Sequence, residues 1–173
     1  VDYLDEIDIE ALCSWQPIND IFAKAKDLFI FQCYTGFAFA DMQNFDINQY
    51  KEINGRWIAR KTRIKTGVPF VNVLLSPAVE ILKRYDWKIP KVSISWYDIQ
   101  LARMGKLIGL DIRLRSHVAR HTFATMMLRN GVKIENLARM LGHTNITQTQ
   151  RYAKVLAVSV QEEFEMIEKK MFN

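Results

Sequence analysis

Stretches with the character of β-strands are confined to one short region of this chain, and that region limits the folds that the chain can adopt. The two strand-like stretches are residues 56–62 and 68–75. Between them lies Arg63-Ile64-Lys65-Thr66-Gly67, a turn-like link whose glycine allows positive φ. The sequence therefore predicts one antiparallel β-hairpin.

The other segments carry the signals of helices. Asn19 or Asp20 can cap a helix that ends at Gly36, and Ser76-Pro77 can begin another. Further helices are expected at residues 7–15, 39–44, 95–108, 117–129 (capped by Ser116), 133–141, 147–154 and 158–172. We therefore expect a mainly α protein with a small antiparallel β-sheet, an α+β arrangement in loose terms.

Length and composition place residues 1–173 in a single domain. The chain contains no repeat, low-complexity tract or linker rich in Gly, Ser or Pro. Its two cysteines form no paired motif, which argues against a disulfide framework or a structural zinc site. Cys33 lies in an apolar run typical of a core thiol in a cytosolic protein. Since no apolar run reaches the roughly 18 residues that span a bilayer, we expect a cytoplasmic protein without a membrane partner.

The charge of the chain is distributed unevenly. Its net charge is +5, but residues 56–154 hold 19 Lys and Arg against five Asp and Glu, while both ends are acidic. A basic stretch of this length favours a polyanionic partner, most simply nucleic acid. Solvated helix faces are the alternative, and charge alone favours nucleic acid only slightly.

Histidine, arginine and tyrosine residues with suitable chemistry gather in the second half of the chain. His117 and Arg120 are three residues apart on one predicted helix, so they share a face. His143 and Tyr152 follow downstream. Arginine binds phosphate oxygens bidentately, histidine transfers protons near neutral pH, and tyrosine can act as a covalent nucleophile. The set suits a phosphodiester, although each residue alone has an ordinary structural explanation.

Three strings in this region resemble the tyrosine recombinase (phage integrase) family, and within it the integrases of conjugative transposons. They are HVARHTFAT at 117–125, LGHT at 141–144 and TQRYA at 149–153. Upstream, YTGFAFAD at 34–41 resembles the first arginine motif of the family. Lys65-Thr66-Gly67 stands where the family has its hairpin lysine. The resemblance covers nearly the whole chain and implies the catalytic-domain fold of that family.

The resemblance implies a bacterial site-specific recombinase that cuts and rejoins double-stranded DNA through a 3′-phosphotyrosine intermediate, in the integration or excision of a mobile element. Tyr152 would be the nucleophile, and Arg120 would stabilise charge on the non-bridging phosphate oxygens. His117 would act as general base. His143 would donate a hydrogen bond to the phosphate, and Lys65 would protonate the leaving 5′-oxygen. Neither a metal nor another cofactor is required.

The chain departs from the family's pattern at one position, because Ala38 stands where the first catalytic arginine is expected. Alanine cannot bind phosphate. Either cleavage is impaired, which would leave a DNA-binding or accessory module, or another arginine substitutes in space. Our candidate is Arg63, because in an extended strand it would point to the same face as Lys65. Asp41 matches the acidic residue that supports the family's arginine pair.

The resemblance also implies partners beyond the catalytic residues. Four bases are predicted to contact DNA phosphates, with solvated charge as an equal alternative: Arg113, Arg115, Lys133 and Arg139. Residues 158–172 form an amphipathic segment that would dock into a neighbouring subunit or pack on its own domain. We expect a homotetramer on DNA for the full-length protein, with an N-terminal arm and a core-binding domain before this one, and a monomer for the fragment.

Two other classes explain less of the sequence. A helix-turn-helix regulator would use residues 132–152, but it would leave the pair of His117 and Arg120 without a role. A type IB topoisomerase would share the chemistry, yet the strings match the integrases better. The resemblance to the recombinases therefore accounts for more of the sequence than either alternative.

Overall fold

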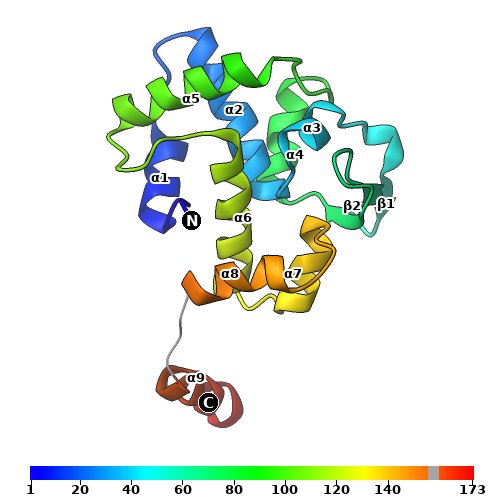
Figure 1. Ribbon diagram of the computed structural model, residues 1–173, viewed down its shortest axis with the longest axis vertical. Coiled ribbons are helices and arrows are strands. Elements are labelled where there is room, and N and C mark those ends of the chain that lie inside the picture. The colour runs from blue at the N-terminus through cyan, green and yellow to red at the C-terminus, as the bar shows by residue number, and fades with distance from the viewer. Residues whose placement is uncertain (156–159) are drawn as a thin grey trace.

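The computed structural model of the protein describes residues 1–155 and 160–173, and most of them are helical (Figure 1). The elements in chain order are α1 (Glu6–Ser14), α2 (Asp20–Thr35), α3 (Phe39–Gln43), the 3₁₀-helix η1 (Ile47–Gln49), β1 (Lys51–Ile53), β2 (Arg56–Thr62), β3 (Pro69–Val73), α4 (Ser76–Arg84), α5 (Ile94–Ile108), α6 (Ser116–Arg129), α7 (Ile134–Leu141), α8 (Thr147–Val155) and α9 (Val160–Phe172). The expectation of a mainly α protein with a small antiparallel sheet is confirmed.

The sheet has three strands instead of the two predicted. Its order is β1-β2-β3, and both pairs are antiparallel. The strand that was missed, β1, is joined to β2 by Asn54 and Gly55, which both have positive φ (51° and 78°). An Asn-Gly pair is a strong hairpin signal, because its two residues tolerate the left-handed backbone of a type I′ turn. The signal was therefore present in the sequence.

Helices α2 and α6 pack against each other at the centre of the body (Figure 1). The apolar face of α2 gives Leu28, Phe29 and Phe31 to the main core, where all three are fully buried. A second, smaller core contains Phe123 from α6 and Tyr152 from α8. Helix α6 thus contributes to both cores, and its N-terminal half carries His117 and Arg120.

Both predicted ends of α2 are confirmed. The side-chain oxygen of Asn19 accepts a hydrogen bond from the backbone N–H of Phe22 at 2.8 Å. Gly36 ends the helix with φ 75°. A Cβ atom on Gly36 would lie 2.5 Å from the ring of Phe123, so glycine is needed for α2 to end against α6. This contact fixes the Gly36 carbonyl group beside the functional site.

Two serines predicted as helix caps do not act as caps. Ser76 and Ser116 are the first residues of α4 and α6, and neither helix has a side-chain cap of its own. The Ser116 hydroxyl lies 2.9 Å from Gln32 Nε2 in the core. The backbone N–H of Ser116 donates instead to Asp98 of α5, at 2.9 Å. A cap supplied by another helix leaves no local signal in the sequence.

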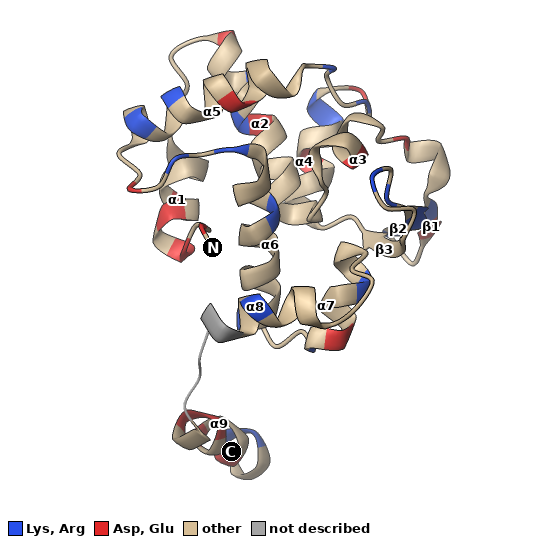
Figure 2. Ribbon diagram, in the orientation of Figure 1, with Lys and Arg blue, Asp and Glu red and all other residues tan. Residues whose placement is uncertain are grey.

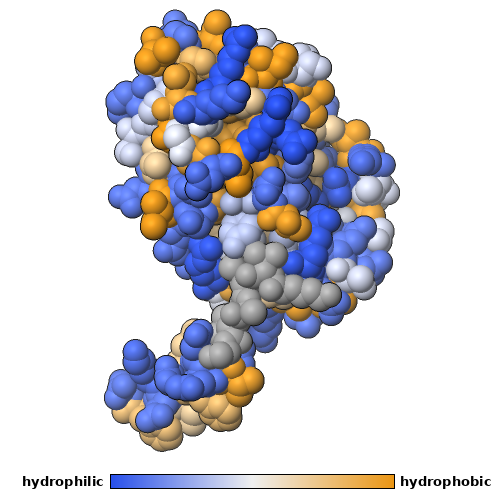
Figure 3. Space-filling view, turned by 60° about the vertical axis from the view of Figure 1, so that its left-hand side comes forward, coloured by the Kyte–Doolittle hydropathy of each residue, from blue (hydrophilic) through white to orange (hydrophobic). Residues whose placement is uncertain are grey.

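Helix α9 differs from the other α-helices that the structure describes because all of its residues are exposed. It lies apart from the body in Figure 1, and its hydrophobic side chains are exposed at the bottom of Figure 3. Val158, the predicted first residue of this segment, falls outside the described residues. Among residues 1–155 and 160–173, no helix is long and apolar enough to cross a membrane.

Candidate active site

A cleft of about 530 Å³ opens beside the N-terminal half of α6. Its walls come from α3, the turn between β2 and β3, α5, α6, α8 and the segment between α7 and α8. Its lining includes Ala38, Asp41, Arg63, Lys65, Asp98, His117, Arg120, His121, His143, Gln148, Arg151 and Tyr152. The structure thus brings all five catalytic candidates, the substitute arginine and its acidic neighbour into one cavity.

Arg120 is anchored in this cleft by two backbone carbonyl groups at the ends of helices. Its guanidinium donates from Nη1 to the oxygen of Gly36 at 2.7 Å and from Nη2 to the oxygen of Leu141. Carbonyl groups at helix ends lack partners within their own helix. Burial, and then the nearby charge of Arg63, lower the pKa of Arg120 to about 10, so that it stays charged at neutral pH. A guanidinium has five N–H donors, so three remain for a ligand.

Arg63 lies next to Arg120 and pairs with a buried carboxylate. Its Nε is 3.8 Å from Oδ2 of Asp41, while Oδ1 of Asp41 accepts the backbone N–H of Ile64 at 3.1 Å. A Cβ atom on Gly142 would lie 2.8 Å from Cδ of Arg63, so the glycine makes room for this side chain. Asp41 therefore has an arginine partner in Arg63, although position 38, which lines the same cleft, is alanine.

Arg63 and Lys65 do not lie on one strand face, contrary to the prediction. Strand β2 ends at Thr62, and residues 64–66 form a turn that is closed by a hydrogen bond from the Gly67 N–H to the Arg63 oxygen at 2.8 Å. Both side chains nevertheless line the cleft. Their shared direction comes from the turn, with Arg63 partly buried and Lys65 exposed.

His143 follows Gly142, directly after the end of α7. Its Nδ1 lies 2.7 Å from the hydroxyl oxygen of Thr149. Burial, followed by the charges of Arg120, Arg151 and Arg63, lowers the pKa of His143 to about 4. The imidazole is therefore neutral at pH 7 and retains one N–H, which suits a hydrogen-bond donor.

Tyr152 is fully buried, with its ring in the core between α6 and α8. Arg151 Nη2 donates a hydrogen bond to its hydroxyl oxygen at 3.0 Å, and the Arg151 guanidinium carbon lies 5.0 Å from the centre of its ring. The ring of His121 lies 5.6 Å from the tyrosine ring. The candidate nucleophile thus faces the cleft but is covered by its neighbours.

Two residues of the cleft, His121 and Arg151, were not assigned to the site from the sequence. The ring of His121 lies 5.6 Å from the ring of Tyr152 and 5.3 Å from the ring of His117, and its Nδ1 is 3.0 Å from the Asp2 carbonyl oxygen. Its spacing of four residues from His117 indicates a shared helix face. Arg151 gave no such signal, because neighbours in a helix point in different directions.

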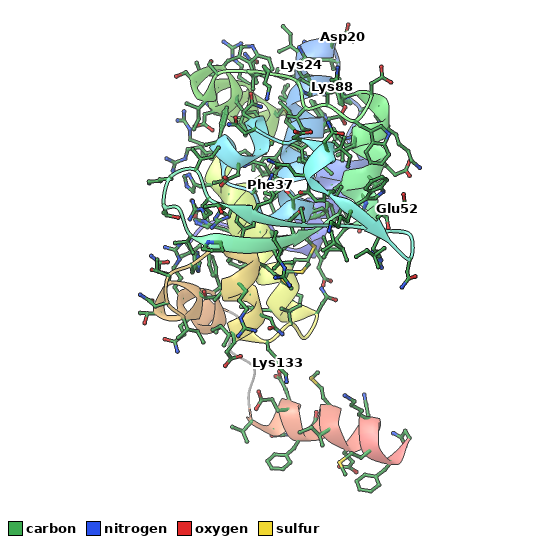
Figure 4. All side chains as sticks on the ribbon, turned by 90° about the vertical axis from the view of Figure 1, so that its right-hand side faces the viewer. Asp20, Lys24, Phe37, Glu52, Lys88 and Lys133 are labelled. Carbon is green, nitrogen blue, oxygen red and sulfur yellow. The ribbon has the colours of Figure 1, made fainter. Side chains whose placement is uncertain are left out.

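The four predicted phosphate contacts lie outside the cleft. Arg113 and Arg115 are in the segment that leads into α6, whose basic residues are blue in Figure 2. Lys133 is at the surface before α7 (Figure 4). Arg139, on α7, lines a separate apolar cleft with Met127 and Met140. All four are exposed, so a large polyanion could reach them.

Comparisons with known protein sequences give matches in one family. The profile of the phage integrase family matches residues 2–158. The tyrosine recombinase XerA of Saccharolobus solfataricus is 40% identical over 65 residues, which cover 38% of this chain and 22% of that protein. XerA of Pyrococcus horikoshii is 37% identical over 90 residues, which cover 52% of this chain and 30% of that protein. The match therefore spans less than a third of the length of these relatives.

Solved structures of similar shape include two protein–DNA complexes. XerH recombinase bound to its difH substrate before cleavage has a TM-score of 0.72 at 16% identity, covering 100% of this chain and 55% of that chain. The Tn1549 transposon integrase with transposon right end DNA has a TM-score of 0.70 at 15% identity, covering 99% and 66%. The catalytic domain of bacteriophage HP1 integrase has a TM-score of 0.63 at 21% identity, covering 99% of this chain and 95% of that chain. At these identities the likeness shows the fold.

Proposed function

Because the chain belongs to the phage integrase family, we propose that it is the catalytic domain of a tyrosine site-specific recombinase, which breaks and rejoins double-stranded DNA during integration or excision of a mobile element. The observation that carries the proposal is the convergence of Tyr152, Arg120, His117, His143 and Lys65 on one cleft. These residues come from distant parts of the sequence. Core packing alone does not require such a set of charged and polar groups to meet in one cavity.

In the proposed reaction the Tyr152 oxygen attacks the scissile phosphorus, and the bond from phosphorus to the 5′-oxygen breaks. The proton of the tyrosine hydroxyl passes to His117, which is exposed at the start of α6. Lys65, exposed in the turn between β2 and β3, gives a proton to the leaving 5′-oxygen. The product is a 3′-phosphotyrosine. Because it conserves a phosphodiester, rejoining needs no ATP, and these steps use side chains alone.

The proposed phosphate site consists of Arg120, Arg63 and His143. Arg120 is held rigidly by two carbonyl groups and is oriented before a ligand arrives. Preorganised donors stabilise the charge of a transition state without reorganisation at the moment of reaction. Neutral His143 adds an N–H donor. The position of Arg63, paired with Asp41 and beside Arg120, supports its role as the substitute for the arginine missing at Ala38.

The competing function is a DNA-binding or accessory module with impaired cleavage. A denaturant-resistant complex separates the two. The protein is incubated with a pool of nicked duplexes of randomised core sequence, denatured with detergent, and the DNA strands that remain attached are sequenced. A recombinase should enrich a defined sequence, and Tyr152→Phe should yield no attached DNA. DNA that binds before denaturation but never survives it would favour the accessory module.

A double substitution tests the role of Arg63. Arg63→Ala should lower the yield of attached DNA, and adding Ala38→Arg to that variant should restore part of it, because both positions line the same cleft. Arg60→Ala serves as the matched control, since Arg60 is an exposed arginine on β2. Full activity of Arg63→Ala would rule out Arg63 as the substitute.

We also propose that α9 docks onto a second copy of the chain within a tetramer on DNA. Phe164 and Ile167 of α9 are 68% and 51% exposed. The body has an apolar cleft of about 270 Å³ between β3, α6 and α7, lined in part by Val71, Met127 and Met140. Deletion of residues 160–173 should preserve single-protomer complexes with DNA in a native gel and reduce larger ones. An unchanged distribution would contradict docking in trans.

A further inference from the structure

The atom that would attack DNA is bound by a residue that the proposed reaction does not use. The Tyr152 hydroxyl oxygen accepts a hydrogen bond from Arg151 Nη2 at 3.0 Å, and the guanidinium carbon of Arg151 lies 5.0 Å from the centre of the Tyr152 ring. The tyrosine side chain is fully buried in this arrangement. One of the two lone pairs of the oxygen therefore accepts from a cationic donor, which fixes the hydroxyl and lowers its nucleophilicity.

Within the part of the chain that the structure describes, Arg151 contacts the Tyr152 side chain but has no carboxylate partner. No carboxylate among residues 1–155 and 160–173 forms an ion pair with it. Of the two acids that line the cleft, Asp41 pairs with Arg63, and Asp98 accepts the first backbone N–H of α6. Arg151 is also close enough to Arg120 for their charges to repel. An anion in the cleft would be a better partner for Arg151 than the neutral tyrosine hydroxyl.

We propose that Arg151 is a positioning residue that stores the Tyr152 hydroxyl in the DNA-free protein and releases it when a DNA phosphate enters the cleft. The inference rests on the proposed function, in which Tyr152 attacks a phosphodiester. Hydrogen bonds between charged partners are roughly twice as strong as those between neutral partners, so the phosphate attracts the guanidinium away from the hydroxyl. Both lone pairs of the Tyr152 oxygen are then available, and Arg151 adds a further positive charge beside the phosphate.

The contact is tested by chemical access to Tyr152 in the DNA-free protein. Tetranitromethane nitrates accessible tyrosines, and peptide mass spectrometry reads each position. In Arg151→Gln the nitration of Tyr152 should be roughly tenfold faster than in the wild type, because loss of one charged hydrogen bond shifts such an equilibrium by about that factor. Arg151→Lys keeps the charge and a donor, so it should retain part of the protection. Arg103→Gln, at an exposed position on α5, is the control.

Tyr97 is an internal reference, because it is also fully buried but lies outside the cleft. If Tyr97 and Tyr152 both become reactive in Arg151→Gln, the variant has loosened the whole fold and the specific contact is overturned. Equal nitration of Tyr152 in the wild type and in Arg151→Gln would also overturn it. The proposal is supported when Tyr152 alone responds.

A second arm adds DNA to the wild type. A short duplex of mixed sequence at low salt should raise the nitration of Tyr152 towards the level of DNA-free Arg151→Gln. Unchanged protection by saturating duplex would overturn the release step. Failure of the proposed function has a different signature, in which no DNA strand survives denaturation although Arg151→Gln still exposes Tyr152. That result would support the contact between Arg151 and the Tyr152 hydroxyl, but it would show that this contact has no role in strand cleavage.

Discussion

The two sides of the cleft hold their main residues in different ways. Arg120 is bound by the carbonyl oxygens of Gly36 and Leu141, which belong to the ends of two other helices. Tyr152 is held by a side chain next to it in the sequence, Arg151. The phosphate-binding side therefore forms together with the packing of α2, α6 and α7. The nucleophile, by contrast, depends on a contact that a ligand can replace without unfolding a helix.

Loss of the anchored arginine should have the largest effect. Arg120→Lys keeps a positive charge but cannot reach both carbonyl groups in the same geometry. We expect the yield of attached DNA to fall by roughly a thousandfold. The free energy of unfolding, measured with urea, should fall by about 2 kcal/mol, because partly buried carbonyl groups lose their donors. If Arg120→Lys were as stable as the wild type, the two carbonyl contacts would not tie the phosphate-binding side to the packing of the helices.

Arg63 should matter less, because it is bound to one carboxylate. We expect Arg63→Ala to lower the yield of attached DNA by roughly a hundredfold and the free energy of unfolding by about 1 kcal/mol. Arg60→Ala should change neither quantity by a comparable amount. A stability loss as large as that of Arg120→Lys would place Arg63 among the anchored residues of the fold.

The pH dependence of stability probes both sides at once, since each holds a partly buried histidine. Burial is the main cause that lowers the pKa of both His143 and His121 to about 4, from an ordinary value of 6.5. The unfolded chain therefore binds more protons between these values. Stability is complete above pH 6.5 and is lost as the pH falls towards 4, by about 1 kcal/mol for each histidine after solvent screening. Urea unfolding at pH 7 and pH 5 measures the loss.

Single substitutions separate these two contributions. His143→Gln should remove the part of the pH-dependent stability loss that comes from the phosphate-binding side. His121→Gln should remove the part that comes from the side holding Tyr152. The slope of stability against pH should become shallower in each variant. An unchanged slope in both would mean that neither histidine is buried as neutral imidazole in the folded protein.

The smallest effect is expected for α9, which belongs to neither side of the cleft. Deletion of residues 160–173 should change the free energy of unfolding of the body by less than about 0.5 kcal/mol, because the helix has no buried residue. A larger loss would show that α9 packs on its own domain in solution. Urea unfolding followed by tryptophan fluorescence reports on the body, since the four tryptophans precede α9.

The sequence predicts the parts of this site that depend on local order. The helix carrying His117 and Arg120 follows from spacing, and the turn with Lys65 follows from a glycine between two strand-like segments. The end of α2 at Gly36 follows from the preference of glycine for positive φ. These features are set by residues a few positions apart, and such patterns can be read without knowing the fold.

Other parts depend on contacts between distant residues. Nothing local indicates that Asp98 caps α6, or that Arg120 binds the ends of α2 and α7. The contact of Arg151 with Tyr152 joins sequence neighbours, but spacing does not predict it, because adjacent helical residues normally point apart. Strand β1 is a different case, because the Asn54-Gly55 pair is a local signal for the turn between β1 and β2.

In the proposed reaction Tyr152 forms the covalent link to DNA, in a cleft prepared for phosphate. The most direct measurement is mass spectrometry of the peptide that remains joined to DNA after nuclease digestion of the detergent-resistant complex. We predict a nucleotide attached through its 3′-phosphate to the oxygen of Tyr152, and no modified peptide from Tyr152→Phe. A link to another residue, or through a 5′-phosphate, would contradict the account.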